Sequence, residues 1–137
     1  MAVVEELLRS ETDGTISFGN HKLAKKAKVE DYPHEGDLLK VKTYSEMTKL
    51  EKNGMFLYES VPGTSVLHFM EKEDGVEFTV EGDEDAQITI GLTDDRAYEV
   101  FVDGSSVGAI KTGFGGKLSL SVELGAADEV PVRVVQI

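Results

Sequence analysis

Apolar and polar residues alternate with a period close to two along most of the chain, which places successive side chains on opposite faces of a sheet. The alternation is regular in the second half and ends in a β-branched segment: Val76–Val80, Ile88–Leu92, Tyr98–Val102, Val107–Lys111, Leu118–Val122 and Val130–Ile137. Turn residues separate these runs at short, similar intervals, which is typical of sandwiches and barrels. The pattern predicts an all-β protein.

The first half alternates less regularly, but it contains six further candidate strands: Glu6–Ser10, Thr15–Phe18, Asp37–Tyr44, Thr48–Lys52, Met55–Ser60 and Thr64–Met70. Two stretches of this half, Ala2–Arg9 and Tyr44–Lys52, are also compatible with short helical turns, although helices of this length are marginal by propensity alone. Strands and helical turns therefore both stay open for these two stretches.

Three turns carry a specific expectation. Asn53-Gly54 lies between two β-rich runs and predicts a hairpin, because both residues tolerate positive φ. Asp103-Gly104 is a second hairpin signal, and we expect its loop to exceed two residues because two serines follow. Val61–Thr64 is expected to form a type II turn with Gly63 at the positive-φ position.

The fold expected from these elements has about ten or eleven short antiparallel strands. Residues 75–137 would form a β-sandwich of immunoglobulin or fibronectin type III kind, packed on an N-terminal β subdomain of residues 1–74, unless the two are one continuous domain. The core candidates are the apolar residues in phase with these strands: Ile16, Phe18, Leu39, Val41, Phe56, Tyr58, Leu67, Phe69, Phe78, Val80, Ile88, Ile90, Tyr98, Val100, Val102, Leu118, Leu120, Val132 and Val134.

Composition excludes several classes of function. The 137 residues include no Cys, which rules out disulfides, thiolate metal sites and a thiol nucleophile. The net charge of −12 argues against nucleic acid and anionic membranes as partners. The first residues are acidic where a signal peptide is basic, so we expect a cytoplasmic protein.

The charge is distributed unevenly. Residues 1–52 carry 9 Lys or Arg against 10 Asp or Glu, whereas residues 53–137 carry 5 against 16. A small basic run lies in the first part: Lys22, Lys25, Lys26 and Lys28. One interpretation is head-to-tail attraction between copies of the chain. The other is an edge strand that lysines protect against aggregation.

Two histidines are weak catalytic candidates. His34 lies in an acidic turn, where a general base or an ordinary solvated side chain would look alike. His68 lies in a strand whose two faces are both mostly apolar, so we expect the strand to be covered on both sides. In that setting a backbone partner or a subunit contact is the commoner role of a histidine.

Carboxylates are weak metal candidates. Asp83 and Asp85 lie in one acidic loop, and Asp94 could join them at a calcium site, although the spacing does not fit an EF-hand loop. The glycine-rich stretch 112–117 lacks the pattern and the following helix of a phosphate loop. We expect it to be a hairpin loop with Phe114 tucked beneath it. No cofactor is expected.

Two resemblances extend this picture. Residues 76–137, with Tyr98-Glu-Val-Phe-Val-Asp-Gly104 and the closing valine-rich strand, resemble small β-sandwich modules appended to polysaccharide-active enzymes. The whole chain is similar to short cytosolic proteins of gut Clostridia, some labelled endosialidase, especially in Asn53-Gly-Met-Phe-Leu-Tyr-Glu-Ser-Val-Pro-Gly-Thr64 and Val80–Ile88. The second resemblance implies the same fold and compartment and supplies no catalytic residues.

Function is expected to be non-enzymatic interaction or self-association. The chain ends in an apolar strand, and an exposed strand of this kind can pair with a second copy through Val132, Val134 and Ile137. One alternative is a carbohydrate-binding accessory module, for which the candidate aromatic platforms are Tyr32, Tyr44, Tyr58 and Tyr98. The other alternative is a small enzyme that uses carboxylates with His34 or His68.

Overall fold

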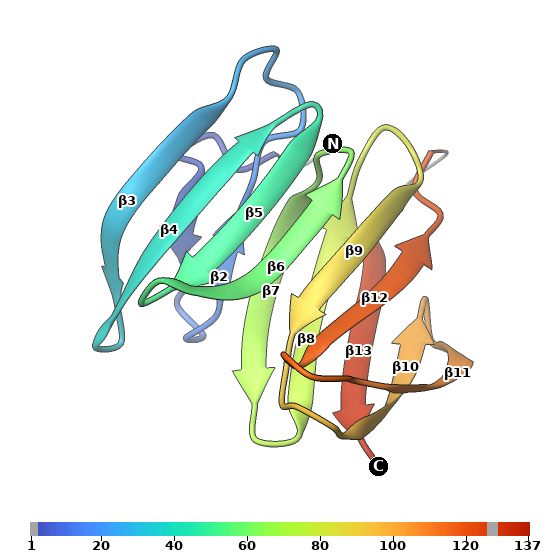
Figure 1. The fold of residues 1–137 in the computed structure, drawn as a ribbon. Coiled ribbons are helices and arrows are strands. Elements are labelled where there is room, and N and C mark those ends of the chain that lie inside the picture. The colour runs from blue at the N-terminus through green and yellow to red at the C-terminus, as the bar shows by residue number, and fades with distance from the viewer. Residues whose placement is uncertain (1–2, 126–128) are drawn as a thin grey trace.

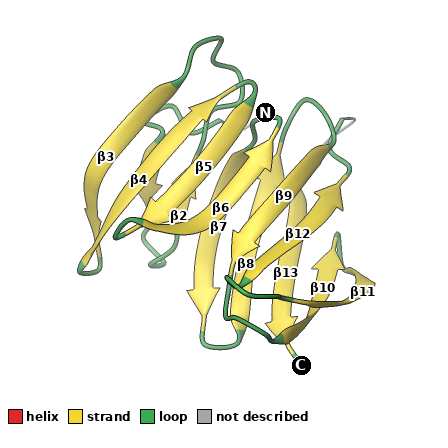
Figure 2. Cartoon of the chain, viewed as in Figure 1, coloured by secondary structure: helices red, strands yellow, loops and turns green. Residues whose placement is uncertain are grey.

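The computed structural model describes residues 3–125 and 129–137, which contain thirteen strands and no helix (Figures 1 and 2). The strands are β1 Leu8–Ser10, β2 Ile16–Phe18, β3 Ala27–His34, β4 Asp37–Tyr44, β5 Met47–Lys52, β6 Met55–Val61, β7 Ser65–Lys72, β8 Gly75–Glu81, β9 Ala86–Gly91, β10 Ala97–Val102, β11 Ser105–Lys111, β12 Lys117–Val122 and β13 Val130–Gln136. The predicted all-β class is confirmed.

The strands form two antiparallel sheets that pack face to face (Figure 1). The seven-stranded sheet has the order β1-β2-β7-β8-β13-β10-β11, and the six-stranded sheet has the order β12-β9-β6-β5-β4-β3. Each sheet therefore combines strands from both sides of position 74. The expected boundary at 74/75 falls in the turn between β7 and β8, which are neighbouring strands of one sheet.

An aromatic cluster joins the two sheets at the centre of the core. Tyr58 of the six-stranded sheet is fully buried against three phenylalanines of the other sheet, with ring centroids 5.3 Å from Phe18 and 5.6 Å from Phe78. Phe69 completes the cluster and stacks on Phe78 at 5.6 Å. Most of these contacts are edge-to-face, the arrangement that aromatic rings prefer in cores.

At two positions a β-bulge changes which side chains of a strand face the core, so strict alternation of buried and exposed residues fails there. The bulge in β6 turns Leu57 into the core beside Tyr58, and Phe56 lies only partly buried on the outer face. The bulge in β7 buries Phe69 and leaves Leu67 half-buried. The core assignments of Phe56 and Leu67 were therefore wrong, because one extra residue reverses the face of every residue beyond it.

Local turns differ from expectation in three places. The described parts of the two possible helical stretches contain turns and strands instead. Asp103 and Gly104 form a two-residue loop with φ of 53° and 82°, since Val102 already pairs with Ser105. The Val61–Pro62 peptide is cis, and φ of Gly63 is not positive, so the turn is not of type II.

The edge strand β3 is the element that the sequence pattern did not predict. Its alternation is broken by a bulge between Val29 and Tyr32, and Pro33 lies near its end. Proline is tolerated there because an edge strand leaves one row of amides unpaired. Lys28 on this strand fits the interpretation of an edge protected by lysines.

Buried hydroxyl groups form a network beneath the Pro62 turn. Thr64 Oγ1 lies 2.8 Å from both the Tyr58 hydroxyl and Ser60 Oγ. Thr48 Oγ1 donates to the Thr64 carbonyl at 2.7 Å and lies 2.8 Å from Thr43 Oγ1. Burial raises the pKa of the Tyr58 hydroxyl, so it stays protonated and available as a donor. The network provides hydrogen-bond partners for buried polar groups on both sides of the Pro62 turn.

His21 lies next to this network with almost no solvent exposure. Its Nδ1 lies 2.7 Å from Ser65 Oγ, and its Nε2, which has no hydrogen-bond partner among the described residues, is 3.7 Å from Asp83 Oδ1. Burial lowers the pKa of His21 below its ordinary value of 6.5, against the opposing effect of the Asp83 charge. The fold therefore holds this imidazole neutral.

Stability is expected to fall as the pH drops below about 6.5, because the unfolded chain then binds a proton that the folded chain excludes. Urea unfolding between pH 7.5 and pH 5 measures the effect, and His21→Gln should flatten it. Below about pH 4.5 both proteins should lose further stability, because the pKa values of Glu11, Asp13 and Asp83 are lowered in the fold. An NMR titration that placed the pKa of folded His21 above 6.5 would contradict this expectation.

Candidate functional site

A groove of about 390 Å³ crosses the outer face of the seven-stranded sheet. It runs over β7, β8, β13 and β10, and we call it the outer groove. The outward side chains that line it are His68, Glu77, Thr79, Phe101, Pro131 and Arg133.

Strand register explains why the outer groove is hollow in the middle and walled at its sides. Thr79 and Pro131, which have short side chains, are direct partners across β8 and β13. In a neighbouring rung Arg133 pairs with Glu77 on one side and with Phe101 on the other. The Arg133 guanidinium lies 4.4 Å from the centre of the Phe101 ring, and this stacking fixes both side chains. One wall of the outer groove is therefore the Phe101 ring, which the Arg133 guanidinium holds in place.

His68 forms the opposite end of the outer groove, and a bulge in β7 positions it. Its φ is 53°, a value that few residues other than glycine adopt, and its side chain is 55% exposed. The backbone amide of His68 donates to Ser17 Oγ at 3.1 Å, which holds the bulge against β2. Strained backbone of this kind is often retained where it aims a side chain at a ligand.

The turn before β2 sets the tautomer of His68. Thr15 Oγ1 donates its only proton to Asp13 Oδ1 at 2.6 Å, so it accepts a hydrogen bond from His68 Nδ1 at 3.0 Å. Asp13 Oδ2 lies 3.3 Å from the same nitrogen. Nδ1 therefore carries the proton in the neutral ring, and Nε2 is left as an acceptor. The hydrogen bonds from Thr15 also lower the pKa of Asp13, which keeps its carboxylate charged.

A second set of contacts braces this end of the groove. Ser17 Oγ donates to Glu11 Oε2 at 2.5 Å, and Arg9 donates two hydrogen bonds to the same oxygen at 3.0 and 3.1 Å. The hydrogen bond from Ser17, followed by that from Arg9, lowers the pKa of Glu11. Since Ser17 also holds the His68 amide, the bulge is fixed to a charged cluster on β1 and β2.

The outer groove combines an apolar surface with complementary hydrogen-bonding groups. Phe101 and Pro131 supply flat apolar contacts, and Arg133 supplies donors. Glu77 forms an ion pair with Lys72 and supplies carboxylate oxygens as acceptors. Thr79 can donate and accept. Such a site suits a polar ligand with an apolar face and several hydroxyl groups.

His34, the other histidine candidate, fastens two parts of the fold together. Its Nε2 donates to the Gly14 carbonyl at 3.2 Å, and its Nδ1 lies 2.9 Å from Ser10 Oγ. Tyr32 contacts the same serine through its hydroxyl at 3.0 Å. Both ring nitrogens of His34 are therefore engaged in joining β3 to β1 and to the turn before β2, at the edge of a cavity of about 460 Å³ between the sheets.

The carboxylates considered for calcium are not brought together. Asp83 forms an ion pair with Lys22 at 2.6 Å, and Asp85 accepts hydrogen bonds from the Leu124 and Gly125 amides. Asp94 lies beyond the other end of β9. Across residues 3–125 and 129–137, no group of three or more His, Asp or Glu side chains is arranged to hold a metal ion.

The predicted interface strand lies inside the sheet. β13 is hydrogen-bonded to β8 on one edge and to β10 on the other, and Val132 and Val134 are buried in the core. A second copy cannot pair with this strand while the sheet is intact, so the expectation for these two valines was wrong. Ile137 is 73% exposed, but it lies beyond the strand.

The exposed aromatic residues also differ from expectation. Tyr58 and Tyr98 are buried, which removes them as ligand platforms. Phe114 is fully exposed, and its loop connects β11 of one sheet to β12 of the other instead of closing a hairpin. The expectation that this ring is tucked beneath its loop was therefore wrong. Phe101, which lines the outer groove, was not among the sequence candidates.

Comparison of the chain with protein-family models, with curated proteins and with solved structures finds no match. The fold and the outer groove define an all-β sandwich protein. Its groove of about 390 Å³, on the outer face of one sheet, has room for a small ligand. No helix in the described part of the chain is long and apolar enough to cross a membrane.

Proposed function

We propose that this protein is a non-enzymatic binding module whose outer groove takes a carbohydrate. The observation that supports this proposal most directly is the rung in which Glu77, Arg133 and Phe101 lie side by side. It offers an acceptor, a donor and an aromatic ring in one line across three strands, and Arg133 covers one face of that ring. A sugar ring has a C–H face that can contact the part of the Phe101 ring that Arg133 leaves uncovered, and hydroxyl groups that can reach both charged side chains.

The same geometry favours binding over catalysis. A glycosidase needs a protonated carboxylic acid beside a second carboxylate. Glu77 forms an ion pair with Lys72. Asp13 accepts a hydrogen bond from Thr15 and lies beside Nδ1 of His68. His68 Nε2 is an acceptor for a ligand hydroxyl in this arrangement. The groove is best suited to holding a sugar, with His68 as an orienting residue.

We expect Phe101→Ala to weaken sugar binding at least about tenfold, which corresponds to about 1.4 kcal/mol. The loss follows from removing the stacking surface and from releasing Arg133 from its fixed position. The measurement is an NMR titration of the labelled protein with a panel of neutral and acidic oligosaccharides. Glu77→Gln and His68→Gln should weaken the same ligands less, because each removes one hydrogen-bonding group.

Phe114→Ala is the matched control, since Phe114 is an exposed phenylalanine outside the groove. It should leave the affinity unchanged. Equal losses in the two alanine variants, or no chemical-shift change with any glycan of the panel, would rule out the outer groove as a sugar site. Retained spectra of both free variants would show that each is folded.

A further inference from the structure

The outer face of the six-stranded sheet, which lies opposite the outer groove, carries an unusual charge pattern. Lys28, Lys42 and Lys49 are direct partners in one rung across β3, β4 and β5. Like charges placed directly opposite one another destabilise a sheet. Such a rung opposes the stability of the folded chain, and it therefore points to a role outside the monomer.

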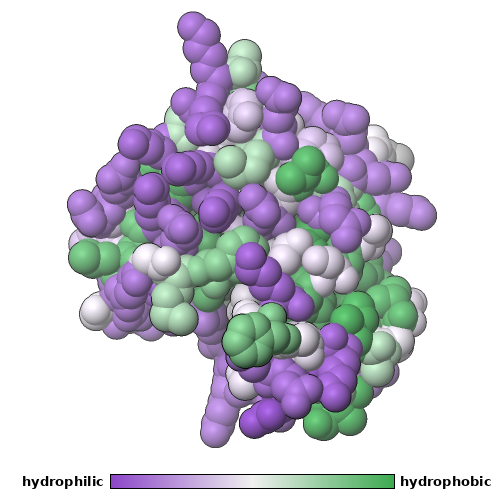
Figure 3. All heavy atoms as spheres, in the orientation of Figure 1, coloured by the Kyte–Doolittle hydropathy of each residue, from purple (hydrophilic) through white to green (hydrophobic). Residues whose placement is uncertain are grey.

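Neighbouring positions add to this basic surface. The outward residues of the six strands include five lysines and three glutamates: Lys28, Lys40, Lys42, Lys49, Lys117, Glu30, Glu51 and Glu59. The face is therefore positive within a chain of net charge −12. Figure 3 views this side, where hydrophilic side chains gather over β3, β4 and β5. We call this surface the basic face.

The lysine charges are only partly neutralised. Lys28 pairs with Glu30 at 2.7 Å, and Lys49 approaches Glu51 at 4.0 Å and lies opposite Glu59 on β6. In the described part of the chain, Lys42 forms no ion pair within 4.0 Å, although its charge contributes, after the hydrogen bond from Lys28, to lowering the pKa of Glu30. The central lysine of the rung therefore has no direct carboxylate partner, and an external anion could supply one.

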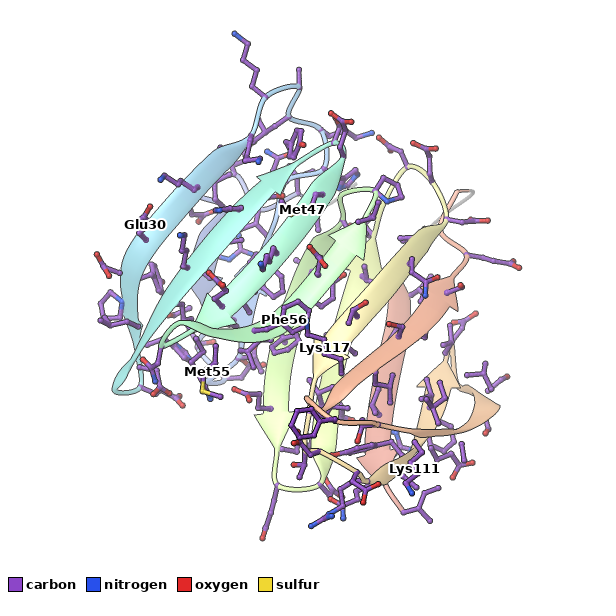
Figure 4. All side chains as sticks on the ribbon, viewed as in Figure 1. Glu30, Met47, Met55, Phe56, Lys111 and Lys117 are labelled. Atoms are coloured by element: carbon purple, nitrogen blue, oxygen red, sulfur yellow. The ribbon has the colours of Figure 1, made fainter. Side chains whose placement is uncertain are left out.

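Apolar side chains border the basic face. Leu38 and Val61 are 50% and 55% exposed on β4 and β6. Phe56 lies on the same side, with Lys117 Nζ 4.7 Å from its ring centre, and Figure 4 shows these two side chains next to each other. These exposed apolar side chains supply contact area beside Lys42, the lysine without a direct ion pair.

We infer that the basic face binds a carboxylate-rich surface on a second copy of this chain, so that copies associate head to tail. Charge complementarity supports this partner, because the chain outside the basic face carries 23 acidic against 9 basic residues. At physiological ionic strength the Debye length is about 8 Å, which screens the overall repulsion between copies but leaves contact pairs largely intact. The contacting surfaces differ, so the contact is heterologous and can extend to larger assemblies.

Lys42→Glu tests the inference, with Lys111→Glu as the matched control. Lys111 is an exposed lysine on β11 of the other sheet, so the two variants change the net charge equally (Figure 4). Light scattering after gel filtration should give wild-type and Lys111→Glu masses above 14.9 kDa that rise with concentration. Lys42→Glu should remain at the monomer mass. In about 1 M salt, where the Debye length is about 3 Å, wild type should also dissociate.

A mixing experiment tests the head-to-tail arrangement. Lys42→Glu keeps the acidic surface, so adding it to wild type should shorten wild-type assemblies by capping them. A wild-type protein that is monomeric at every concentration would overturn the inference, and so would equal effects of the two charge reversals. A monomeric wild type that binds polyglutamate, with loss of binding in Lys42→Glu, would overturn the second copy as partner and indicate a separate acidic protein.

Discussion

Gly63→Ala is expected to destabilise the protein by about 3 kcal/mol or more, the largest effect of any single change considered. A Cβ atom at this position would lie 1.9 Å from the Tyr44 carbonyl oxygen and 3.2 Å from the carbonyl carbon of Ser45. Both obstacles are backbone, so no side-chain rotation relieves the overlap. The Gly63 amide also donates to the Ser45 carbonyl at 3.0 Å, and this hydrogen bond would have to lengthen.

Gly113→Ala provides the matched control for this prediction. Gly113 also lies in a loop and lacks positive φ, but its Cβ would meet no atom within 4 Å. We expect this variant to range from unchanged to about 1 kcal/mol more stable, because alanine restricts the unfolded chain. Urea unfolding followed by circular dichroism gives both values. Similar midpoints for the two variants would show that the turn can move away from β4 at little cost.

The second large effect is expected for Thr64→Val, which should destabilise the protein by about 1 to 3 kcal/mol. Valine has nearly the same shape, so packing is preserved, but the Tyr58 hydroxyl and Ser60 Oγ both lose the partner that lies 2.8 Å away and keep only their hydrogen bond with each other. Each hydrogen bond lost between buried groups costs about 0.5 to 1.5 kcal/mol. Thr64→Ser keeps the hydroxyl and should cost clearly less.

Two further variants isolate the hydroxyl network as the cause. Thr89 lies on the exposed face of β9, where Oγ1 contacts Ser119 Oγ at 3.0 Å, so Thr89→Val should change stability by less than about 0.5 kcal/mol. Tyr58→Phe should cost less in the Thr64→Val background than in wild type, because it removes a hydroxyl that has already lost one of its two partners. Additive losses in this cycle would place the cost of Thr64→Val elsewhere.

Alternation was sufficient to predict β8, β9, β10 and β12, because buried and more exposed positions alternate along each of them and no internal Pro or Gly breaks the phase. It failed where a bulge intervenes. Phe56 and Leu67 are as apolar as their buried neighbours, and the extra residue that moves them out of the core has no distinctive sequence signal. β3 was missed for the same reason, since its bulge and Pro33 obscure the alternation.

The candidate site depends on strand order, which one sequence does not reveal. Glu77, Arg133 and Phe101 come from β8, β13 and β10, which are far apart in sequence but adjacent in the sheet. An outward residue on a strand has no recognisable signal until its neighbours are known. His68 was identified as a candidate by its residue type, but its partners Asp13 and Thr15 lie more than fifty positions away.

The position of β13 between β8 and β10 has a consequence for how the protein is made. Of the thirteen described strands, β13 is the last to leave the ribosome, yet the β10–β11 hairpin joins the seven-stranded sheet only through it. Until β13 is inserted, the facing edges of β8 and β10 expose unpaired backbone amides and carbonyls. The nascent chain therefore passes through a state with two open sheet edges, which makes early release of a truncated chain a route to aggregation.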